Sequence, residues 1–544
     1  MAQIRVSNLT FSYENSADDV LENVSFNIDT DWKLGFIGRN GKGKTTLLNL
    51  LMGKYEYQGS ISSSTNFDYF PYLVDKEKET QTADELMASW KPGVEPWQVL
   101  VQMNLLKMGP ECLYRPFSTL SHGERTRVML AVLFADENEF LLIDEPTNHL
   151  DQDARNIVKE YLAGKKGFIL VSHDRDLLDA VCDHVLVLNR QTIEVQAGNF
   201  SSWWENKEKS DAFARAENEK HLKEIGKLRD AADRSSRWAD KSENTKIGFD
   251  PIKEHDRSKS TRSFIGAKTK KMEARVKAYE KRLDREIEEK EGLLQDIESV
   301  IDLKLCPLKF HKNVLIEAKE LSLRYANSDT ALFDDIRFQV KQGDRIILAG
   351  ENGCGKSSII KAINRQLSQQ GTKGMLTEDY QDSRSINAAD QMGNQGTNQR
   401  TYRGADADDS LIISGTLNVA SGLNISYVSQ DTSFLKGSLK DYCQKRSLDC
   451  TLFLAVLRQL DFGREQFVKN MEDYSEGQKK KVLIASSLIT PAHLYIWDEP
   501  LNYIDVFSRM QIEKLILDAK PTMLLVEHDI RFQEKIAMDI IQIR

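Results

Sequence analysis

The chain has 544 residues and a formal net charge of −9, with 40% hydrophobic and 29% charged residues. This length exceeds what one hydrophobic core supports, so at least two domains are expected. The negative net charge excludes a protein whose surface is basic throughout. No stretch approaches the roughly 18 consecutive apolar residues of a membrane helix, and the start, "MAQIRVSNLTFSY", lacks a signal-peptide pattern. We therefore expect a cytoplasmic protein.

Four motifs occur twice in the same order along the chain. "IGRNGKGKTTLLNLL" returns as "AGENGCGKSSIIKAI", "LSHGERTRVMLAVLF" as "YSEGQKKKVLIASSL", "FLLIDEPTNHLD" as "LYIWDEPLNYID", and "LVSHDRD" as "LVEHDIR". A repeated motif order predicts repeated domains. We therefore expect two homologous α/β domains, the first domain at 1–200 and the second domain at 312–544, joined by a linker at 201–311. The polar composition of 366–418 predicts an inserted surface loop in the second domain.

Each repeat begins with a phosphate-binding loop of the pattern G-x-x-x-x-G-K-[ST]. The loop follows an apolar strand ("KLGFIG", "RIILAG") and opens a helix, which is the context that the motif requires. Lys44 and Lys356 would neutralise β- and γ-phosphate oxygens, while Thr45 and Ser357 would hold Mg²⁺. A chance match on a glycine-rich turn is the alternative, and the repetition argues against it. The residues expected to contact the nucleotide are Gly38, Arg39, Asn40, Gly41, Lys42, Gly43, Lys44, Thr45 and Thr46 in the first domain, and Gly350, Glu351, Asn352, Gly353, Cys354, Gly355, Lys356, Ser357 and Ser358 in the second.

A Walker B strand follows in each repeat, with four apolar residues before an Asp-Glu pair. Asp144 and Asp498 would lie near Mg²⁺, because a buried strand of this kind ends at the ligand-binding edge of a parallel sheet. Glu145 and Glu499 would orient or deprotonate the attacking water. The alternative is an ordinary junction between a strand and a turn.

One histidine follows a further apolar strand in each repeat. His173 comes after "GFILVS" and His528 after "TMLLVE", so either side chain could reach the γ-phosphate. A lone histidine is more often a packed or surface residue. The repetition of the residue downstream of Walker B favours a role in hydrolysis.

With these loops and strands, "LSHGE" and "YSEGQ" resemble the signature sequence of ABC-type ATPases. The resemblance implies two tandem P-loop domains that close head to tail over two ATP molecules. It places Ser121 and Gly123 against the ATP of the second domain. It likewise places Ser475 and Gly477 against the ATP of the first domain.

The same resemblance assigns further nucleotide contacts and identifies departures from the family pattern. Tyr13 and Tyr325 lie where an aromatic ring stacks on adenine, and Gln430 matches the Q-loop glutamine that contacts Mg²⁺. The equivalent position of the first domain is near Tyr72, so its Q-loop is atypical. His122 and Glu476 replace a signature glycine.

The sequence of the linker predicts a helical hairpin with a basic arm. Apolar residues at coiled-coil spacing form one seam from Met272 to Ile301, and Leu222, Ile225, Leu228 and Ala232 offer a partner seam. Between Arg257 and Arg285 the local net charge is +8, which favours contact with a phosphate backbone. A solvated spacer is the alternative. The tip is expected near 246–263, and its candidate contact residues are Ile247, Phe249, Pro251, Ile252, Arg257, Lys259 and Arg262.

A tandem pair of ABC domains with such a linker and no membrane segment resembles the ABC-F family. The resemblance extends to the branch that protects ribosomes against lincosamides, streptogramin A and pleuromutilins. It implies a monomer that needs no membrane partner, with ATP and Mg²⁺ as cofactors. The linker would enter the bacterial ribosome from the tRNA exit site, close to 23S rRNA and the P-site tRNA. A housekeeping translation ATPase of the same family and the ATPase subunit of a drug exporter remain alternatives.

Overall fold

The structure is a computed structural model, and it describes residues 3–13, 19–136, 139–148, 150–189, 193–247, 278–279, 281–282, 285, 305, 307–325, 331–369, 400–401 and 411–543. It divides into two compact units: Met1–Ser201 with Val300–Arg544, and Ser202–Ser299. None of the helices in these described ranges combines the length and apolar character that crossing a membrane requires.

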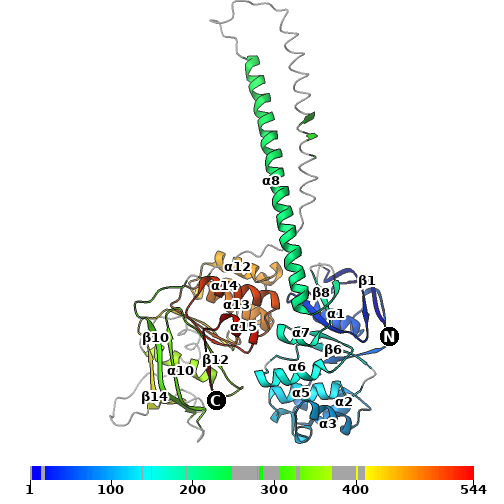
Figure 1. Cartoon of the computed structure of the whole chain (residues 1–544), viewed down its shortest axis with the longest axis vertical. Coiled ribbons are helices and arrows are strands. Elements are labelled where there is room, and N and C mark those ends of the chain that lie inside the picture. Colours follow the sequence, from blue (N-terminus) through cyan, green and yellow to red (C-terminus); the bar gives the residue numbers. More distant parts are fainter. Residues whose placement is uncertain are drawn as a thin grey trace, which may run out of the picture. The chain divides into compact units, whose positions relative to one another are not determined.

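The first domain contains an antiparallel sheet of order β2-β1-β4 and a larger sheet of order β5-β6-β7-β3-β8-β9. In the larger sheet every neighbouring pair is parallel except β8 and β9. Figure 1 labels β1, β6 and β8 of this domain. The strands are β1 (Gln3–Phe11), β2 (Leu21–Asp29), β3 (Lys33–Gly38), β4 (Gln58–Ser62), β5 (Asn66–Phe70), β6 (Glu139–Asp144), β7 (Phe168–Val171), β8 (His184–Leu188) and β9 (Ile193–Ala197). The helices are α1 (Lys44–Leu51), α2 (Ala83–Trp90), α3 (Pro96–Leu105), α4 (Glu111–Tyr114), α5 (His122–Leu133), α6 (Gln152–Ala163) and α7 (Arg175–Val181).

The second domain repeats this arrangement. Its antiparallel sheet has the order β11-β10-β14-β13, and its parallel sheet has the order β15-β16-β17-β12-β18. The strands are β10 (Val314–Tyr325), β11 (Phe333–Lys341), β12 (Arg345–Ala349), β13 (Arg400–Thr401), β14 (Leu411–Val419), β15 (Ile425–Val428), β16 (Leu494–Asp498), β17 (Met523–Val526) and β18 (Asp539–Gln542). The helices are α10 (Lys356–Gln369), α11 (Leu439–Lys445), α12 (Cys450–Gln459), α13 (Glu476–Ile489), α14 (Val506–Ala519) and α15 (Ile530–Ile536).

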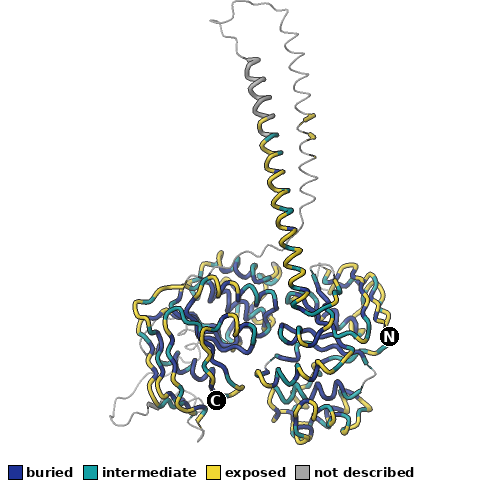
Figure 2. The backbone as a smooth tube through the Cα atoms, viewed as in Figure 1, coloured by how far each residue is buried: buried dark blue, intermediate teal, exposed yellow. Residues whose placement is uncertain are grey.

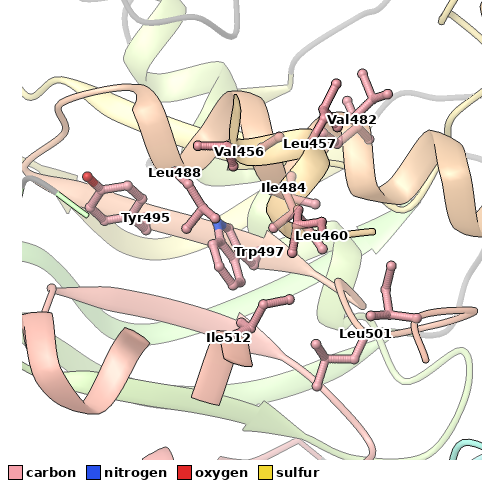
Figure 3. Packing of buried hydrophobic residues seen from close by; sticks show 14 of the residues in the cluster. Val456, Leu457, Leu460, Val482, Ile484, Leu488, Tyr495, Trp497, Leu501 and Ile512 are labelled. Carbon is pink, nitrogen blue, oxygen red and sulfur yellow. The ribbon is translucent and has the colours of Figure 1, made fainter. Parts of the chain in front are cut away.

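The Walker B strand of the second domain lies at the centre of a hydrophobic core. All five residues of β16 are buried, as expected for a strand covered on both faces of a parallel sheet. Trp497 packs with residues of α12, α13 and α14 (Figure 3). Its indole Nε1 donates to Ser487 Oγ at 2.9 Å, so the polar end of this buried ring is satisfied. The packing fixes the strand whose last residue, Asp498, accepts a hydrogen bond from Ser357.

The first half of the linker forms one continuous helix, α8 (Phe200–Ile247). Most of its described side chains are exposed (Figure 2), but Ala214 and Ile225 are buried and Leu228 is half-buried. Leu222 was expected in this seam, and that expectation is wrong because its side chain is 56% exposed. His221, one position earlier, is half-buried and restores the spacing of three and four residues.

The rest of the predicted hairpin lies mostly outside the described residues. Of the second seam only Tyr279 is described, and it is 47% exposed. Among the candidate tip residues, Ile247 is the last residue of α8. The other six lie outside the described residues: Phe249, Pro251, Ile252, Arg257, Lys259 and Arg262.

Two segments are more ordered than the sequence suggested. The insertion at 366–418 is not a loop at its ends, because α10 continues to Gln369 and β14 begins at Leu411. The β14 strand pairs along β10 and therefore belongs to the antiparallel sheet. At the end of the predicted linker, Leu305 packs in the core of the second domain and Leu308 N donates to Ala492 O at 2.8 Å. The packing of Leu305 and the backbone bond of Leu308 extend the second domain towards its N-terminal side.

Candidate nucleotide sites

The phosphate loops join a central strand to a helix in both domains. In the first domain β3 ends at Gly38 and α1 begins at Lys44. Gly43 has a φ of 100°, and a Cβ atom added there would lie 2.6 Å from Val20 Cγ1, so only glycine fits. No side chain caps α1, which leaves the backbone N–H groups of its first turn available to an anion.

The lysine of each loop points back into the loop. Lys44 Nζ donates to Gly38 O at 2.7 Å, and Lys356 Nζ donates to Gly350 O at 2.8 Å. Both lysine side chains are buried, and burial lowers the pKa of Lys44. Two cations held inside anion-binding loops fit the triphosphate that the motif predicts.

The expected Mg²⁺ ligands meet at the carboxyl end of the Walker B strands. Thr45 Oγ1 donates to Asp144 Oδ2 at 3.0 Å. In the second domain Asp498 accepts a hydrogen bond from Ser357, while its Oδ1 is buried without a partner. Burial, followed by the charge of Glu499, raises the pKa of Asp498 to about 6. A carboxylate with one oxygen that lacks a hydrogen-bond partner, beside a hydroxyl group, can bind a hard cation such as Mg²⁺.

The protein alone offers few ligands for such a cation. Within the ranges that the structure describes, no group of three or more His, Cys, Asp or Glu side chains could hold a metal ion. Mg²⁺ usually takes its remaining ligands from substrate phosphates and water. The residues present therefore fit a cation that arrives with a nucleotide.

Glu145 and His173 are adjacent in the first site. Glu145 has a φ of 51°, and its backbone N–H donates to Val171 O at 2.9 Å. Its Oε1 lies 3.3 Å from His173 Nε2, which also lies 3.0 Å from Asn40 Oδ1. Burial, followed by the charge of Asp144, raises the pKa of Glu145 to about 8, and burial lowers the pKa of His173. Without a nucleotide the pair is therefore a protonated acid beside a neutral imidazole.

The matching groups of the second site have different partners. Glu499 Oε2 accepts from Gln430 Nε2 at 2.8 Å and from Asn502 Nδ2 at 2.7 Å. His528 Nε2 lies 3.9 Å from Glu499 Oε1 and is buried without a hydrogen-bond partner. Burial, followed by the charge of Lys356, lowers the pKa of His528 to about 3. This imidazole is neutral and free to meet a phosphate oxygen.

The aromatic residues expected beside adenine make equivalent hydrogen bonds. The Tyr13 hydroxyl lies 2.8 Å from Thr46 Oγ1, and the Tyr325 hydroxyl lies 3.0 Å from Ser358 Oγ. Tyr13 is 42% exposed and lines the cavity at the first site, so part of its side chain is accessible to a ligand. Both rings are thereby fixed at the start of the helix that follows the phosphate loop.

The signature serines cap the helices that follow them. Ser121 Oγ accepts from Glu124 N at 3.2 Å at the start of α5, and Ser475 Oγ accepts from Gln478 N at 3.3 Å at the start of α13. Both are capping boxes, which stabilise a helix start by about 1 kcal/mol. The hydroxyls are therefore held at the helix ends, where a phosphate would be bound.

The first nucleotide site is composed of residues from both domains. A cavity of about 590 Å³ is lined by Tyr13, Lys44 and Glu145 on one side and by Ser475 and Gly477 on the other. This is the head-to-tail arrangement that the sequence resemblance implies for the first site.

The phosphate loop of the first domain also contacts the second domain directly. Asn40 Nδ2 donates to Tyr503 O at 2.6 Å across the site. Tyr503 was not singled out from the sequence, although it lies inside the repeated motif "DEPLNYID". Its φ of 63° turns the chain so that its carbonyl can accept this bond.

The structure locates the atypical Q-loop of the first domain. Phe70 pairs with Ile143 and Val428 with Trp497, each one residue before the Walker B aspartate, so Tyr72 is equivalent to Gln430. The Tyr72 hydroxyl donates to Asp68 Oδ2 at 2.7 Å instead of reaching Glu145. Tyr69, which the sequence did not single out, donates to Asp144 Oδ2 at 3.1 Å. A tyrosine hydroxyl thus contacts the Walker B aspartate of the first site.

Comparisons with known proteins agree with this geometry. The family model described as "ABC transporter" matches residues 21–148 and 333–502. The chain is 24% identical over 532 residues to the ribosome protection protein VmlR of Bacillus subtilis (strain 168), covering 96% of this chain and 84% of that protein. It is 23% identical over 558 residues to the probable ATP-binding protein YheS of Escherichia coli (strain K12), covering 94% and 74% respectively.

A solved structure shares the fold across both domains. The archaeal ribosome recycling factor aABCE1, solved in complex with the ribosomal stalk protein aP1, aligns with a TM-score of 0.57 and 16% identity, covering 98% of this chain and 87% of that one. At this identity the likeness shows the fold alone. The expectation of two tandem ATPase domains of one type is confirmed.

Proposed function

Because the chain belongs to the ABC family of ATPases, within its ABC-F group, we propose that it binds the bacterial ribosome and protects it from antibiotics that act at the peptidyl-transferase centre. The observation that carries the ATP-dependent closure in this proposal is the composite cavity at the first site. Because one wall comes from each domain, a nucleotide bound there would hold the two domains together.

ATP with Mg²⁺ would supply a γ-phosphate that can be transferred to water. In this chain Lys44 and Lys356 would bind the phosphates, and Thr45 with Asp144 and Ser357 with Asp498 would hold the cation, joined by Gln430 at the second site. Glu145 and Glu499 would then orient the attacking water or, once ionised, deprotonate it. His173 and His528 are neutral, and each would donate a hydrogen bond to the γ-phosphate through the one ring N–H that a neutral imidazole keeps. Loss of that phosphate would let the domains separate.

The ribosome as partner is supported by charge and by similarity. The linker between Arg257 and Arg285 has a net charge of +8 in a chain of −9, which suits a phosphate backbone. A similar protein is named for ribosome protection. In our proposal the linker enters from the tRNA exit site, near 23S rRNA and the P-site tRNA, and its tip displaces the drug. The protein acts in the cytoplasm as a monomer, and hydrolysis releases it from the ribosome.

A housekeeping role in translation is the second candidate. The similarity to YheS is about as strong as that to VmlR, at 23% and 24% identity. Both candidates use the same nucleotide chemistry. They differ in whether binding changes the response of the ribosome to a drug.

The deciding experiment is translation in vitro on bacterial ribosomes stalled by a lincosamide, a pleuromutilin or a streptogramin A. The intact chain is compared with a chain in which residues 247–260 are replaced by a short Gly-Ser turn. Rescue by the intact chain and its loss in the replaced chain is the expected result. Binding without rescue would indicate the housekeeping role. Absence of binding, even with Glu145→Gln and Glu499→Gln, would reject both.

A further inference from the structure

The two phosphate loops differ in the charge of one residue. Arg39 follows the first glycine of the loop in the first domain, and Glu351 occupies the same position in the second. The equivalence is fixed because Gly38 is the last residue of β3 and Gly350 directly follows β12, the corresponding strand of the second parallel sheet. A cation in one loop is therefore replaced by an anion in the other.

At the first site an acidic residue of the second domain meets this cation. Arg39 Nη1 lies 3.7 Å from Asp461 Oδ1, and the two side chains are only 17% and 23% exposed. The guanidinium group also lies over the ring of Phe507, 5.8 Å from its centroid. The ion pair therefore spans the first site and is partly shielded from water.

The residue of the first domain that corresponds to Asp461 is Lys107. Each lies 14 residues before the signature serine, which is Ser121 or Ser475. Each has a left-handed backbone, with φ of 53° for Lys107 and 60° for Asp461. In each case the backbone N–H donates at 3.0 Å to the carbonyl three residues earlier, just after α3 or α12. The two positions share one local structure and carry opposite charges.

The residues around the second site leave this lysine available. Lys107 Nζ lies 3.0 Å from Glu160 Oε2, but both side chains are more than 60% exposed, so this pair contributes little. Glu351 is exposed and makes no ion pair within the described ranges. Asp153 of the first domain occupies the position that corresponds to Phe507 of the second domain. The first-domain surface opposite Glu351 therefore carries a further carboxylate. With two carboxylates, Glu351 and Asp153, the second site has more negative charge to neutralise with a cation than the first site has.

We propose that the second site closes through an ion pair between Lys107 and Glu351, the charge-reversed counterpart of Arg39 and Asp461. The reversal also selects the partner surface. Two first domains from separate copies would place Arg39 against Lys107, and two second domains would place Glu351 against Asp461. Both pairings oppose like charges, so each phosphate loop accepts only the unlike domain.

This inference rests on the head-to-tail closure over ATP that is part of the proposed function. Its experiments need only the full chain, ATP and Mg²⁺, without ribosomes. A chain that closes on ATP without the Lys107–Glu351 pair would overturn this inference and leave the ribosome proposal standing.

A zero-length carbodiimide cross-link detects the pair directly, because it joins an amine only to a carboxylate in contact with it. Without nucleotide, mass spectrometry should find Lys107 joined to Glu160. In the Glu145→Gln/Glu499→Gln chain that retains ATP through gel filtration, Lys107 should be joined to Glu351. Persistence of the Glu160 product alone in that chain would overturn the proposal.

Charge exchange supplies an independent test in the same background. Lys107→Glu or Glu351→Lys alone should raise the ATP concentration for half-maximal closure by about 5-fold, and the double exchange should restore it to within about 2-fold. Glu160→Gln is the matched control, since it frees Lys107 and should not weaken closure. Additive losses in the double exchange would reject the ion pair.

The selection of the partner surface has its own test. Arg39→Glu alone places a carboxylate against Asp461 within one chain, whereas in a pair of first domains the same carboxylate would face Lys107 of the second copy. Light scattering with ATP should then show dimers that increase with protein concentration, while the original chain stays monomeric. A variant that stays monomeric at the highest accessible concentration would contradict the selection by charge.

Discussion

Arg175 of the first domain and Glu513 of the second form an ion pair that is almost fully buried. Arg175 Nη1 donates to Glu513 Oε2 at 3.1 Å, and the side chains are 2% and 4% exposed. Arg175 opens α7, directly after the His173-Asp174 pair, and Glu513 lies on α14. The pair therefore links the histidine loop of one domain to a helix of the other.

Removing one partner of this pair should weaken the association of the domains. Glu513→Ala leaves Arg175 buried without a counter-charge, which costs about 3–5 kcal/mol when the charge cannot reach water. The domains can separate and hydrate the arginine, so we expect a shift towards the open chain and a higher ATP requirement for closure. Energy transfer between one dye on each domain measures this shift.

Lys535→Ala provides the control for that experiment. Lys535 Nζ lies 3.4 Å from Glu513 Oε2, but the lysine is 51% exposed. Its loss should therefore change the free energy of closure by less than about 1 kcal/mol. Equal effects of Glu513→Ala and Lys535→Ala would contradict the importance of burial.

The signature glycines should tolerate alanine differently. A Cβ atom at Gly477 would lie 2.5 Å from Tyr503 O and 3.3 Å from Asn40 Nδ2, whereas one at Gly123 would meet no atom closer than 3.7 Å. We expect Gly477→Ala to lower the melting temperature of the nucleotide-free chain. Gly123→Ala should leave it unchanged or raise it, because alanine is favoured over glycine in a helix by roughly 0.5–1 kcal/mol. Calorimetry of both variants compares them, and a larger loss for Gly123→Ala would be evidence against the close approach of Asn40.

The adenine contact should depend on the ring of Tyr13 more than on its hydroxyl. Tyr13→Ala removes the stacking surface, and we expect ATP binding to weaken by about 10-fold, given 1–3 kcal/mol for a base stacked on an aromatic ring. Tyr13→Phe loses only the hydrogen bond to Thr46 and should weaken binding less. Titration of a chain carrying Lys356→Ala reports the first site alone. Similar losses for both Tyr13 variants would place adenine elsewhere.

The stability of the nucleotide-free chain should fall as pH rises through neutrality. The pKa of Glu145 is about 8 in the folded chain, against about 4.3 for an unperturbed glutamate. Between these values the folded chain keeps a proton that the unfolded chain has lost, so unfolding releases it. Each pH unit in this window should therefore cost up to about 1.4 kcal/mol, and the loss should level off above pH 8.

Denaturant unfolding of the original chain and of Glu145→Gln from pH 6 to 9 checks this expectation. The variant should show a flatter profile, because its amide does not titrate. The exposed Glu160→Gln change serves as the control and should keep the original slope. An unchanged slope in Glu145→Gln would assign the pH dependence to another group.

The local chemistry could be predicted from the sequence wherever a motif specifies its own backbone structure. Glycines, a lysine and a hydroxyl residue at fixed spacing specify a strand, a phosphate loop and a helix, and the structure forms them at Gly38–Lys44 as expected. The apolar strands before Asp144 and Asp498 were likewise predictable, because a strand buried on both faces has a continuous apolar sequence. The repetition of each motif gave the domain plan.

Tertiary structure alone decided which side chains meet. Asn40 and Tyr503 are 463 positions apart, and Arg175 and Glu513 are 338 apart, so no local pattern could pair them. The exposed side chain of Leu222 shows that local sequence also fails to determine which face of a single helix is buried. The spacing of apolar residues is compatible with more than one helix face, and packing against a partner selects among them. The sequence by itself determined the ATP-binding chemistry of this protein, while packing between the domains decided how the first site is completed.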